Sequence, residues 1–228
     1  MLFADIPMPA RLAARPRDVR GLPVLAITPW EHGEPRFAIT GTARILICAV
    51  ERRCSICGTE MAPGPVFRVV AGEEADAIGA ASAAGVPYAN QAATVEPPGH
   101  RSCMLYAAVV CPWLARPNAR RSADAAALGF DIGRGEARGA GGAVVGFDRF
   151  EFRVGEYVMF RFSGLREFRP HLLGEEQYEA LGEAVKAEAG TAETKSETPE
   201  CPPYLLADEL AAELRHAAYV RATYARGV

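Results

Sequence analysis

Apolar residues along this chain recur with two periods, one typical of strands and one typical of helices. Phe150, Phe152 and Val154 alternate with charged residues, and a second apolar run, residues 157–162, follows after Gly155 and Glu156. A two-residue break between two such runs predicts a β-hairpin. Spacings of three and four residues between apolar positions predict helices, which lie at residues 42–52, 100–110, 175–188 and 204–226.

Weaker patterns fill the remaining chain. Residues 22–27 and 36–40 are short β-prone runs on either side of a turn at 31–34, and residues 66–70 form another β-prone run. Residues 71–95 are rich in alanine and glycine and predict a loose helix or a loop. The six glycines of residues 129–143 predict a connection, and residues 189–199, which lack large apolar side chains, predict a linker.

These elements predict an α+β protein with a compact core, a β-hairpin domain and a C-terminal amphipathic helix. The predicted order begins with an extended basic arm at 1–22 and a core domain at 23–118. A Gly-rich connection at 129–143 leads to a hairpin plus helix at 144–188. A linker at 189–203 then precedes the C-terminal helix at 204–228.

Hydropathy and charge exclude some classes of protein. No run of about 18 apolar residues suggests a membrane span, and the first residues do not resemble a signal peptide. We therefore expect a cytoplasmic protein. The net charge is −3, with 13 arginines against 10 acidic residues in 1–121 and an acidic balance afterwards. This balance does not resemble that of a dedicated DNA-binding domain.

Four residues carry the clearest chemical signal. Cys54 and Cys57 form a Cys-x-x-Cys turn followed by Gly58, and His100 and Cys103 form a second pair. Three thiolates and one imidazole are a known ligand set for structural Zn²⁺. His100 and Cys103 share one face at the start of the predicted helix, where the positive helix end favours thiolate. The sequence therefore predicts structural zinc held by these four residues.

The other cysteines are weaker candidates. Cys111 lies eight residues beyond Cys103, about 12 Å along a helix, so it should not reach the same ion. Cys48 would replace His100 only if the chain folded back. Buried, unreactive thiols are the simpler interpretation of Cys48 and Cys111, and the sequence assigns no role to Cys201.

The order of turn, hairpin and ligand-bearing helix resembles that of treble-clef zinc fingers. This resemblance implies that the domain at 23–118 has a treble-clef-like zinc-binding core. The wider chain resembles an uncharacterised family of small bacterial and phage proteins with a Cys-x-x-Cys…His-x-x-Cys motif. That resemblance covers about residues 8–118 and rests on segments 9–13, 17–23, 54–57, 97–103 and 111–114. It carries no activity across, and the insertion at 71–95 and the C-terminal extension depart from the family pattern.

Three further segments each allow two interpretations. The arm at 1–22 is either a basic arm for nucleic acid or a solvated tail, and its modest charge favours the tail. The aromatic hairpin either stacks bases beside its arginines or turns one face into the core, and we favour the core. The C-terminal helix, with Leu206, Leu210 and Leu214 every four residues, docks either on a partner or on its own body.

These patterns favour a zinc-stabilised, non-enzymatic binding or adaptor protein that recognises protein or nucleic acid. The rival is an enzyme, or a subunit of one, that uses the zinc site as a scaffold around a pocket near the 144–162 hairpin. A nuclease of the HNH type is a minor possibility, because His32 and His171 are the histidines outside the finger and the tail and neither has an HNH-like context. The sequence identifies no catalytic residue.

Overall fold

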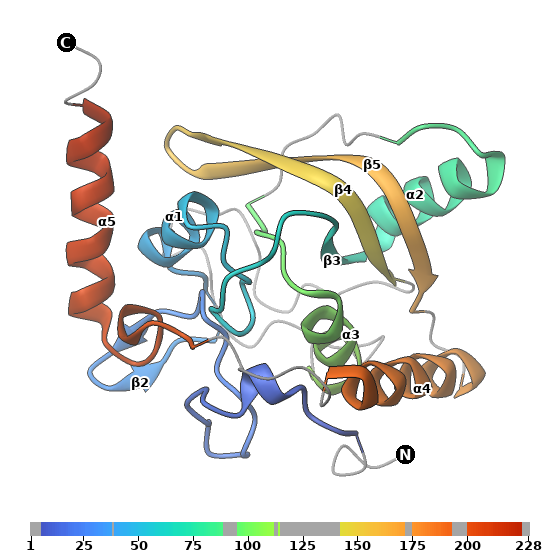
Figure 1. Cartoon of the computed structure of the whole chain (residues 1–228), viewed down its shortest axis with the longest axis horizontal. Coiled ribbons are helices and arrows are strands. Elements are labelled where there is room, and N and C mark those ends of the chain that lie inside the picture. Colours follow the sequence, from blue (N-terminus) through green and yellow to red (C-terminus); the bar gives the residue numbers. More distant parts are fainter. Residues whose placement is uncertain are drawn as a thin grey trace.

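The structure is a computed structural model, and it describes residues 6–37, 39–88, 95–111, 114, 142–171, 175–192 and 200–224. It is an α+β fold in which helices surround a small antiparallel sheet (Figure 1). The fold class predicted from the sequence is therefore confirmed at this level. None of the described helices combines the length and the apolar character needed to cross a bilayer.

The sheet has the strand order β3-β4-β5, with β3 (Val66–Ala71), β4 (Gly142–Val154) and β5 (Val158–Pro170) all antiparallel. The predicted hairpin is present, and its strands are longer than expected. Register pairs Phe150 with Phe162 and Phe152 with Phe160. Because β3 pairs with β4, one sheet joins a strand of the predicted zinc-binding segment to the predicted hairpin.

Alternation along the hairpin separates its two faces. Phe147, Phe160 and Phe162 are buried, whereas the side chains on the other face are exposed and include Arg149, Arg153 and Arg161. Phe150 and Phe152 are partly buried against the same core. This face of the hairpin therefore forms core, as expected from the simpler of the two interpretations.

The helices cover the sheet from several sides. Helix α1 (Thr42–Val50) is buried over Ala43–Ala49, as a helix that is apolar all round should be. The insertion predicted as a loose helix or loop holds α2 (Gly72–Ala84). Helix α3 (Arg101–Val110) packs against β3 and against α4 (Glu175–Ala192), which lies beside it in Figure 1.

One predicted hairpin is wrong in its extent. Instead of strands at 22–27 and 36–40, the structure has β1 (Trp30–Glu31) and β2 (Glu34–Pro35). His32 and Gly33 form the turn with φ of 52° and 82°, the left-handed backbone of a tight hairpin. Residues 22–27 pair elsewhere, because the Ala26 amide donates to the Ile56 carbonyl at 3.0 Å, beside the cysteine turn.

Two predicted connections fall largely outside the described residues. Of the glycine-rich segment 129–143, only residues 142 and 143 are described, and they belong to β4. Helix α4 continues to Ala192, so the first part of the predicted linker 189–203 is helical. Residues 193–199 lie outside the described part of the chain, and a short 3₁₀ turn, Pro203–Leu205, follows them.

The N-terminal arm is not a solvated tail over residues 6–22. Leu12 has no exposed surface and Arg15 is 2% exposed. A 3₁₀ turn, Ala10–Leu12, and a bridge between Arg17 and Pro23 hold the arm against the body. Its most buried arginine is therefore a structural residue.

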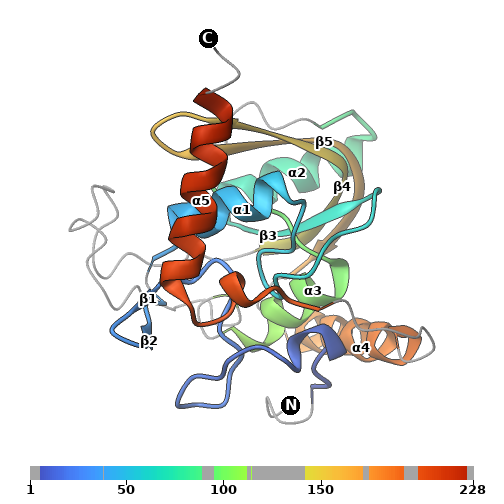
Figure 2. The same ribbon diagram turned by 60° about the vertical axis from the view of Figure 1, so that its left-hand side comes forward.

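Helix α5 (Glu209–Tyr224) packs along α1, on the outside of the molecule (Figure 2). Its buried side carries Ala212, with Tyr219 and Val220 partly buried against the core. Leu210 and Leu214 are 71% and 62% exposed. The helix docks on its own body, but through another face than the leucine spacing predicted.

Glu51, next after α1, fastens α5 to the body. Its carboxylate accepts hydrogen bonds from the hydroxyls of Tyr204 and Tyr219, both at 2.6 Å, and from Nε of Arg215 at 2.8 Å. Burial alone would raise the pKa of Glu51, but these bonds, together with one from Arg53, lower that pKa to about 2.

We expect the contribution of Glu51 to stability to depend on pH. Its pKa in the folded protein lies below the ordinary value of 4.5, so the stabilisation is complete above about pH 4.5 and is lost as the pH falls towards 2. Glu51→Gln should therefore lower the melting temperature at neutral pH. The gap between variant and wild type should narrow over that acid range, and a gap that does not change with pH would show that Glu51 is not held ionised.

Candidate metal centre

Four residues predicted from the sequence lie together in the structure. The ligand atoms of Cys54, Cys57, His100 and Cys103 all lie within 4.8 Å of one another. The three cysteines are buried and His100 is partly exposed, and none of the cysteines is in a disulfide. A tetrahedral ion with metal–sulfur distances of about 2.3 Å has edges of about 3.8 Å. The cluster is therefore of the right size for a metal ion after small side-chain movements.

The first ligand pair sits in a turn that forms from local hydrogen bonds. The Gly58 amide donates to the Cys54 carbonyl at 2.9 Å, and the Cys54 amide donates to the Thr59 carbonyl at 3.0 Å. Gly58 has a φ of +77°, which favours glycine, and a Cβ there would lie 2.6 Å from Sγ of Cys201. The turn thus needs glycine both for its backbone and for its close neighbour.

The second pair begins helix α3. His100 is the N-cap residue, and Cys103 lies in the first helical turn. Gly99, just before them, exchanges two backbone hydrogen bonds with Phe67 of β3, and the Ser55 amide donates to the Pro98 carbonyl at 3.0 Å. These bonds bring the second pair to the cysteine turn, although 42 residues separate Cys57 from His100.

The imidazole of His100 is oriented by its neighbours. Its Nδ1 faces Sγ of Cys57 at 3.5 Å, and its Nε2 lies 3.1 Å from the Glu60 carbonyl oxygen. A metal on Nδ1 leaves the proton on Nε2, where it donates to that carbonyl, as is typical behind metal-bound histidine. Arg11 also approaches Nε2, at 2.9 Å. Two donors cannot share that contact, so we expect Arg11 to move when the site is loaded.

The pKa values of the three thiols in the cluster depend on one another. Hydrogen bonds from Cys103 and then from Cys54 hold the pKa of Cys57 well below its ordinary value, whereas the pKa values of Cys54 and Cys103 are raised. Three sulfurs this close and this buried cannot all ionise without added positive charge. A divalent cation supplies that charge, so metal binding and the loss of the thiol protons are linked.

Arg15, which the sequence did not indicate, lies near this site because it contacts Cys201, the side chain next to Gly58. Its guanidinium donates to Sγ of Cys201 at 3.3 Å, to the Leu205 carbonyl at 2.6 Å and to the Val24 carbonyl at 2.8 Å. Among the described residues no carboxylate contacts it. Burial lowers its pKa, while the nearby Cys201 and Cys57 raise it. One divalent ion with three thiolates carries a net charge of −1, which this cation would balance.

The remaining cysteines and histidines lie outside the four-residue cluster. Cys48 is buried in α1, where burial raises the pKa of its thiol to about 12, so it is an unreactive core thiol as expected. Cys111 caps the end of α3. His32 is exposed in the β1–β2 turn, and His171 is buried at the end of β5.

Gly99 gives a test of how closely the two ligand pairs must approach. A Cβ at this position would lie 2.6 Å from Cε of Met104 and 2.8 Å from Sγ of Cys54. We expect Gly99→Ala to weaken metal binding and to reduce the free energy of unfolding by about 1–3 kcal/mol. Gly155→Ala is the matched control, since its nearest atom would be 4.0 Å away. Equal metal affinity of the two variants in a chelator competition would contradict this packing.

Comparison with protein-family models, with curated proteins and with solved structures gives no match to this chain. The resemblance to a family of bacterial and phage proteins therefore stays a prediction. Evidence for the function of this chain therefore comes from the candidate metal centre itself.

Proposed function

We propose that this chain is a zinc-stabilised, non-enzymatic binding or adaptor protein that recognises protein or nucleic acid. One observation carries the proposal: a complete Cys₃His set gathered in a largely buried cluster. Four protein ligands fill the coordination of a tetrahedral zinc ion and leave no position for a water or a substrate. The metal then serves as a scaffold.

The donor set favours zinc among the available metals. Three thiolates and an imidazole suit Zn²⁺, whereas Mg²⁺ and Ca²⁺ take oxygen ligands. The ordinary hydrogen bond behind His100 and the buried sulfurs fit a closed structural site. Zinc is therefore the ion that we assign to this centre.

The parts around the ion support a treble-clef-like arrangement. The cysteine turn comes first, then β3, then the bridge from Phe67 to Gly99, and then α3 with the second ligand pair. Here α2 is inserted between the two sides of that bridge, and the main partner of β3 is β4. We propose that the core is a treble clef whose hairpin has been opened by this insertion.

Surface hollows are the candidate places for a partner or a substrate. One, of about 640 Å³, lies between the β1–β2 turn and the start of α5 and includes Trp30 and Asp208. Another, of about 500 Å³, lies at the tip of the β4–β5 hairpin and includes Arg153, Tyr157 and Arg161. Neither includes a metal ligand, which supports a separation between the metal and recognition.

The hollow at the tip of the β4–β5 hairpin is the observation that supports the enzyme alternative. Its polar groups all come from one hairpin, so they line a shallow surface rather than converge from several elements as in most active sites. The nuclease variant has less support, because neither His32 nor His171 belongs to the cluster.

Cobalt substitution tests whether the ion is closed to ligands. Co²⁺ in place of Zn²⁺ should give the visible d–d bands of a tetrahedral thiolate site, and added cyanide or imidazole should leave them unchanged. Bands that shift with added ligand would mean an open coordination position. That result would favour the enzyme alternative over a scaffold.

A further inference from the structure

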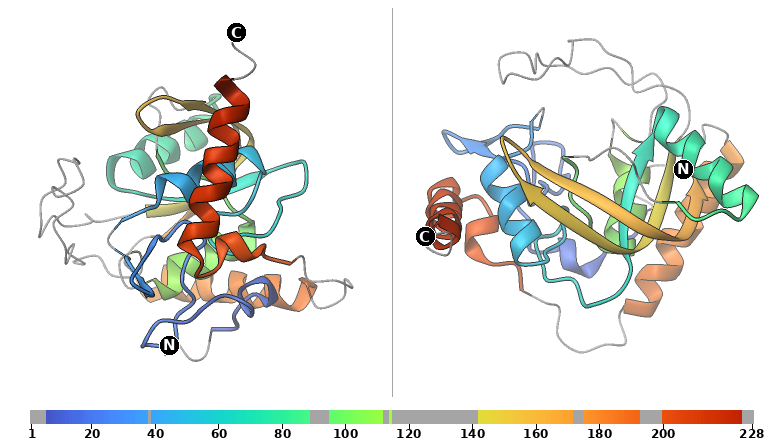
Figure 3. Two further views of the ribbon diagram at one scale, coloured as in Figure 1. Left: turned by 90° about the vertical axis from the view of Figure 1, so that its left-hand side faces the viewer. Right: turned by 90° about the horizontal axis from the view of Figure 1, so that it is seen from above.

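The outward face of α5 carries apolar side chains that are largely exposed. Leu210 and Leu214 lie one turn apart and are 71% and 62% exposed, and Ala218 and Ala222 continue the row towards the C-terminal end. Figure 3 (left) shows α5 lying across the front of the molecule with its outer side turned away from the body. A continuous exposed apolar row is more typical of a contact surface than single exposed residues are.

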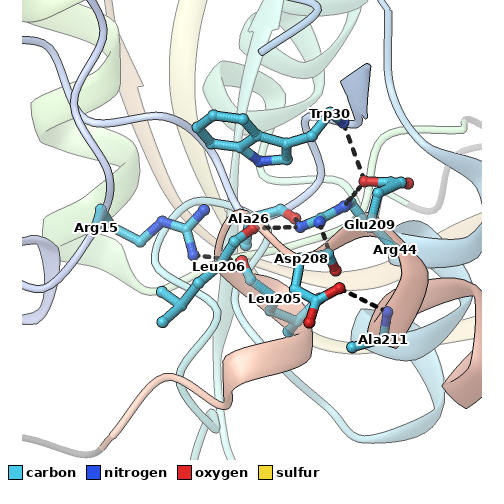
Figure 4. A network of polar contacts seen from close by, with 9 residues as sticks. All are labelled: Arg15, Ala26, Trp30, Arg44, Leu205, Leu206, Asp208, Glu209 and Ala211. Carbon is cyan, nitrogen blue, oxygen red and sulfur yellow. Dashed lines mark hydrogen bonds and ion pairs between the residues drawn. The ribbon is translucent and has the colours of Figure 1, made fainter. Parts of the chain in front are cut away.

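This face cannot turn inwards, because the opposite face is fixed. Ala212 is fully buried, and Tyr219 and Arg215 both bond to Glu51. The base of the helix is held as well. Arg44 bonds to Glu209 and to the Leu206 carbonyl, and Arg15 bonds to the Leu205 carbonyl (Figure 4). Burying the leucines against the chain itself would break these contacts.

The face has opposite character at its two ends. Large side chains and an acid, Glu213, lie in the N-terminal half, and small side chains and a base, Arg221, lie in the C-terminal half. Glu213 is 58% exposed, and its one contact among the described residues is a loose one with His216 at 3.8 Å. Arg221 is exposed. A copy of this face running in the opposite direction would place leucine against alanine and acid near base.

We propose that α5 is a self-association surface, on which the α5 helix of a second copy of this chain packs antiparallel about a two-fold axis. Leu210 and Leu214 of each copy lie against Ala218 and Ala222 of the other, and Glu213 of each lies near Arg221 of the other. Such an interface is isologous, so both copies use the same residues. A helix of 16 residues is about 24 Å long, so the contact is small and the dimer dissociates in the micromolar range.

Sedimentation velocity across a range of protein concentrations tests this proposal on the full, metal-loaded chain. Wild type should change from monomer to dimer as concentration rises. Leu214→Glu should remain a monomer at all these concentrations, whereas Val19→Glu, at a fully exposed site on the N-terminal arm, should dimerise like wild type. Circular dichroism and metal content should be unchanged in both. A wild type that stays monomeric, or a Leu214→Glu variant that still dimerises, would overturn the proposal.

Charge exchange tests the antiparallel direction. Glu213→Arg alone and Arg221→Glu alone should each weaken the dimer by about 5–10 fold, because like charges then face each other across the axis. The double variant Glu213→Arg/Arg221→Glu should recover most of the lost affinity, since acid again lies near base. No recovery would contradict the antiparallel arrangement.

Discussion

Replacing Cys57 by serine is expected to abolish metal binding and to unfold the region around the centre. Cys57 faces His100, and the two ligand pairs join the cysteine turn to the start of α3. Structural zinc supplies about 10–16 kcal/mol of apparent binding free energy in zinc-finger peptides, and a whole domain is stable by only about 5–15 kcal/mol. Loss of one thiolate should therefore remove most of the cooperative melting transition.

The matched control is Cys111→Ser, which changes a partly exposed cysteine at the end of α3 that is not in the cluster. This variant should keep one metal per chain, and its free energy of unfolding should lie within about 1 kcal/mol of the wild-type value. Metal content and melting measured together separate the two cysteines. A Cys57→Ser variant that keeps full metal content and an unchanged melt would show that the ligand assignment is wrong.

Arg44→Met should cause the next largest loss, about 3–5 kcal/mol in the free energy of unfolding. Arg44 has no exposed surface, and its Nε donates to Glu209 at 2.8 Å. It also donates to the Ala26 carbonyl at 3.2 Å and to the Leu206 carbonyl at 3.0 Å. Methionine fills the space but leaves the carboxylate and the carbonyls without this donor.

The control for Arg44 is Arg36→Met. Arg36 pairs with Glu31 at 2.7 Å, but both side chains are more than half exposed, so its loss should cost less than about 1 kcal/mol. Urea denaturation of the two variants gives the comparison. The double variant Arg44→Met/Glu209→Met should regain part of the stability, since no buried charge is then left alone. Equal losses for Arg36→Met and Arg44→Met would contradict the anchoring role.

The spacing of the four residues was enough to predict that they lie together. Cysteines two residues apart form a turn that depends mainly on local hydrogen bonds, and His100 and Cys103 share one helical face. Such local features can be recognised from the sequence alone. The hairpin was predictable for the same reason, because alternation and a short break between two runs reflect the register of the strands.

Contacts between residues far apart in the chain could not be recognised in the same way. Arg15 is one of four arginines in the arm, and only the fold brings it to Cys201, 186 positions later. Helix α5 shows why spacing alone misleads. Leucines every four residues predicted the docked face, but the bond that Glu51 accepts from Tyr219 and the bond that Arg44 donates to Glu209 fix the helix with Leu210 and Leu214 outwards. Polar contacts therefore determine the orientation of α5 more than its row of leucines does.

The central claim is that Cys54, Cys57, His100 and Cys103 hold one structural zinc ion, and metal content is its most direct measurement. Elemental analysis of the purified chain should give one zinc per chain, and a sample treated with chelator should melt at a much lower temperature. Absence of zinc, a redox-active metal such as iron in its place, or an unchanged melt after zinc is removed would contradict the claim.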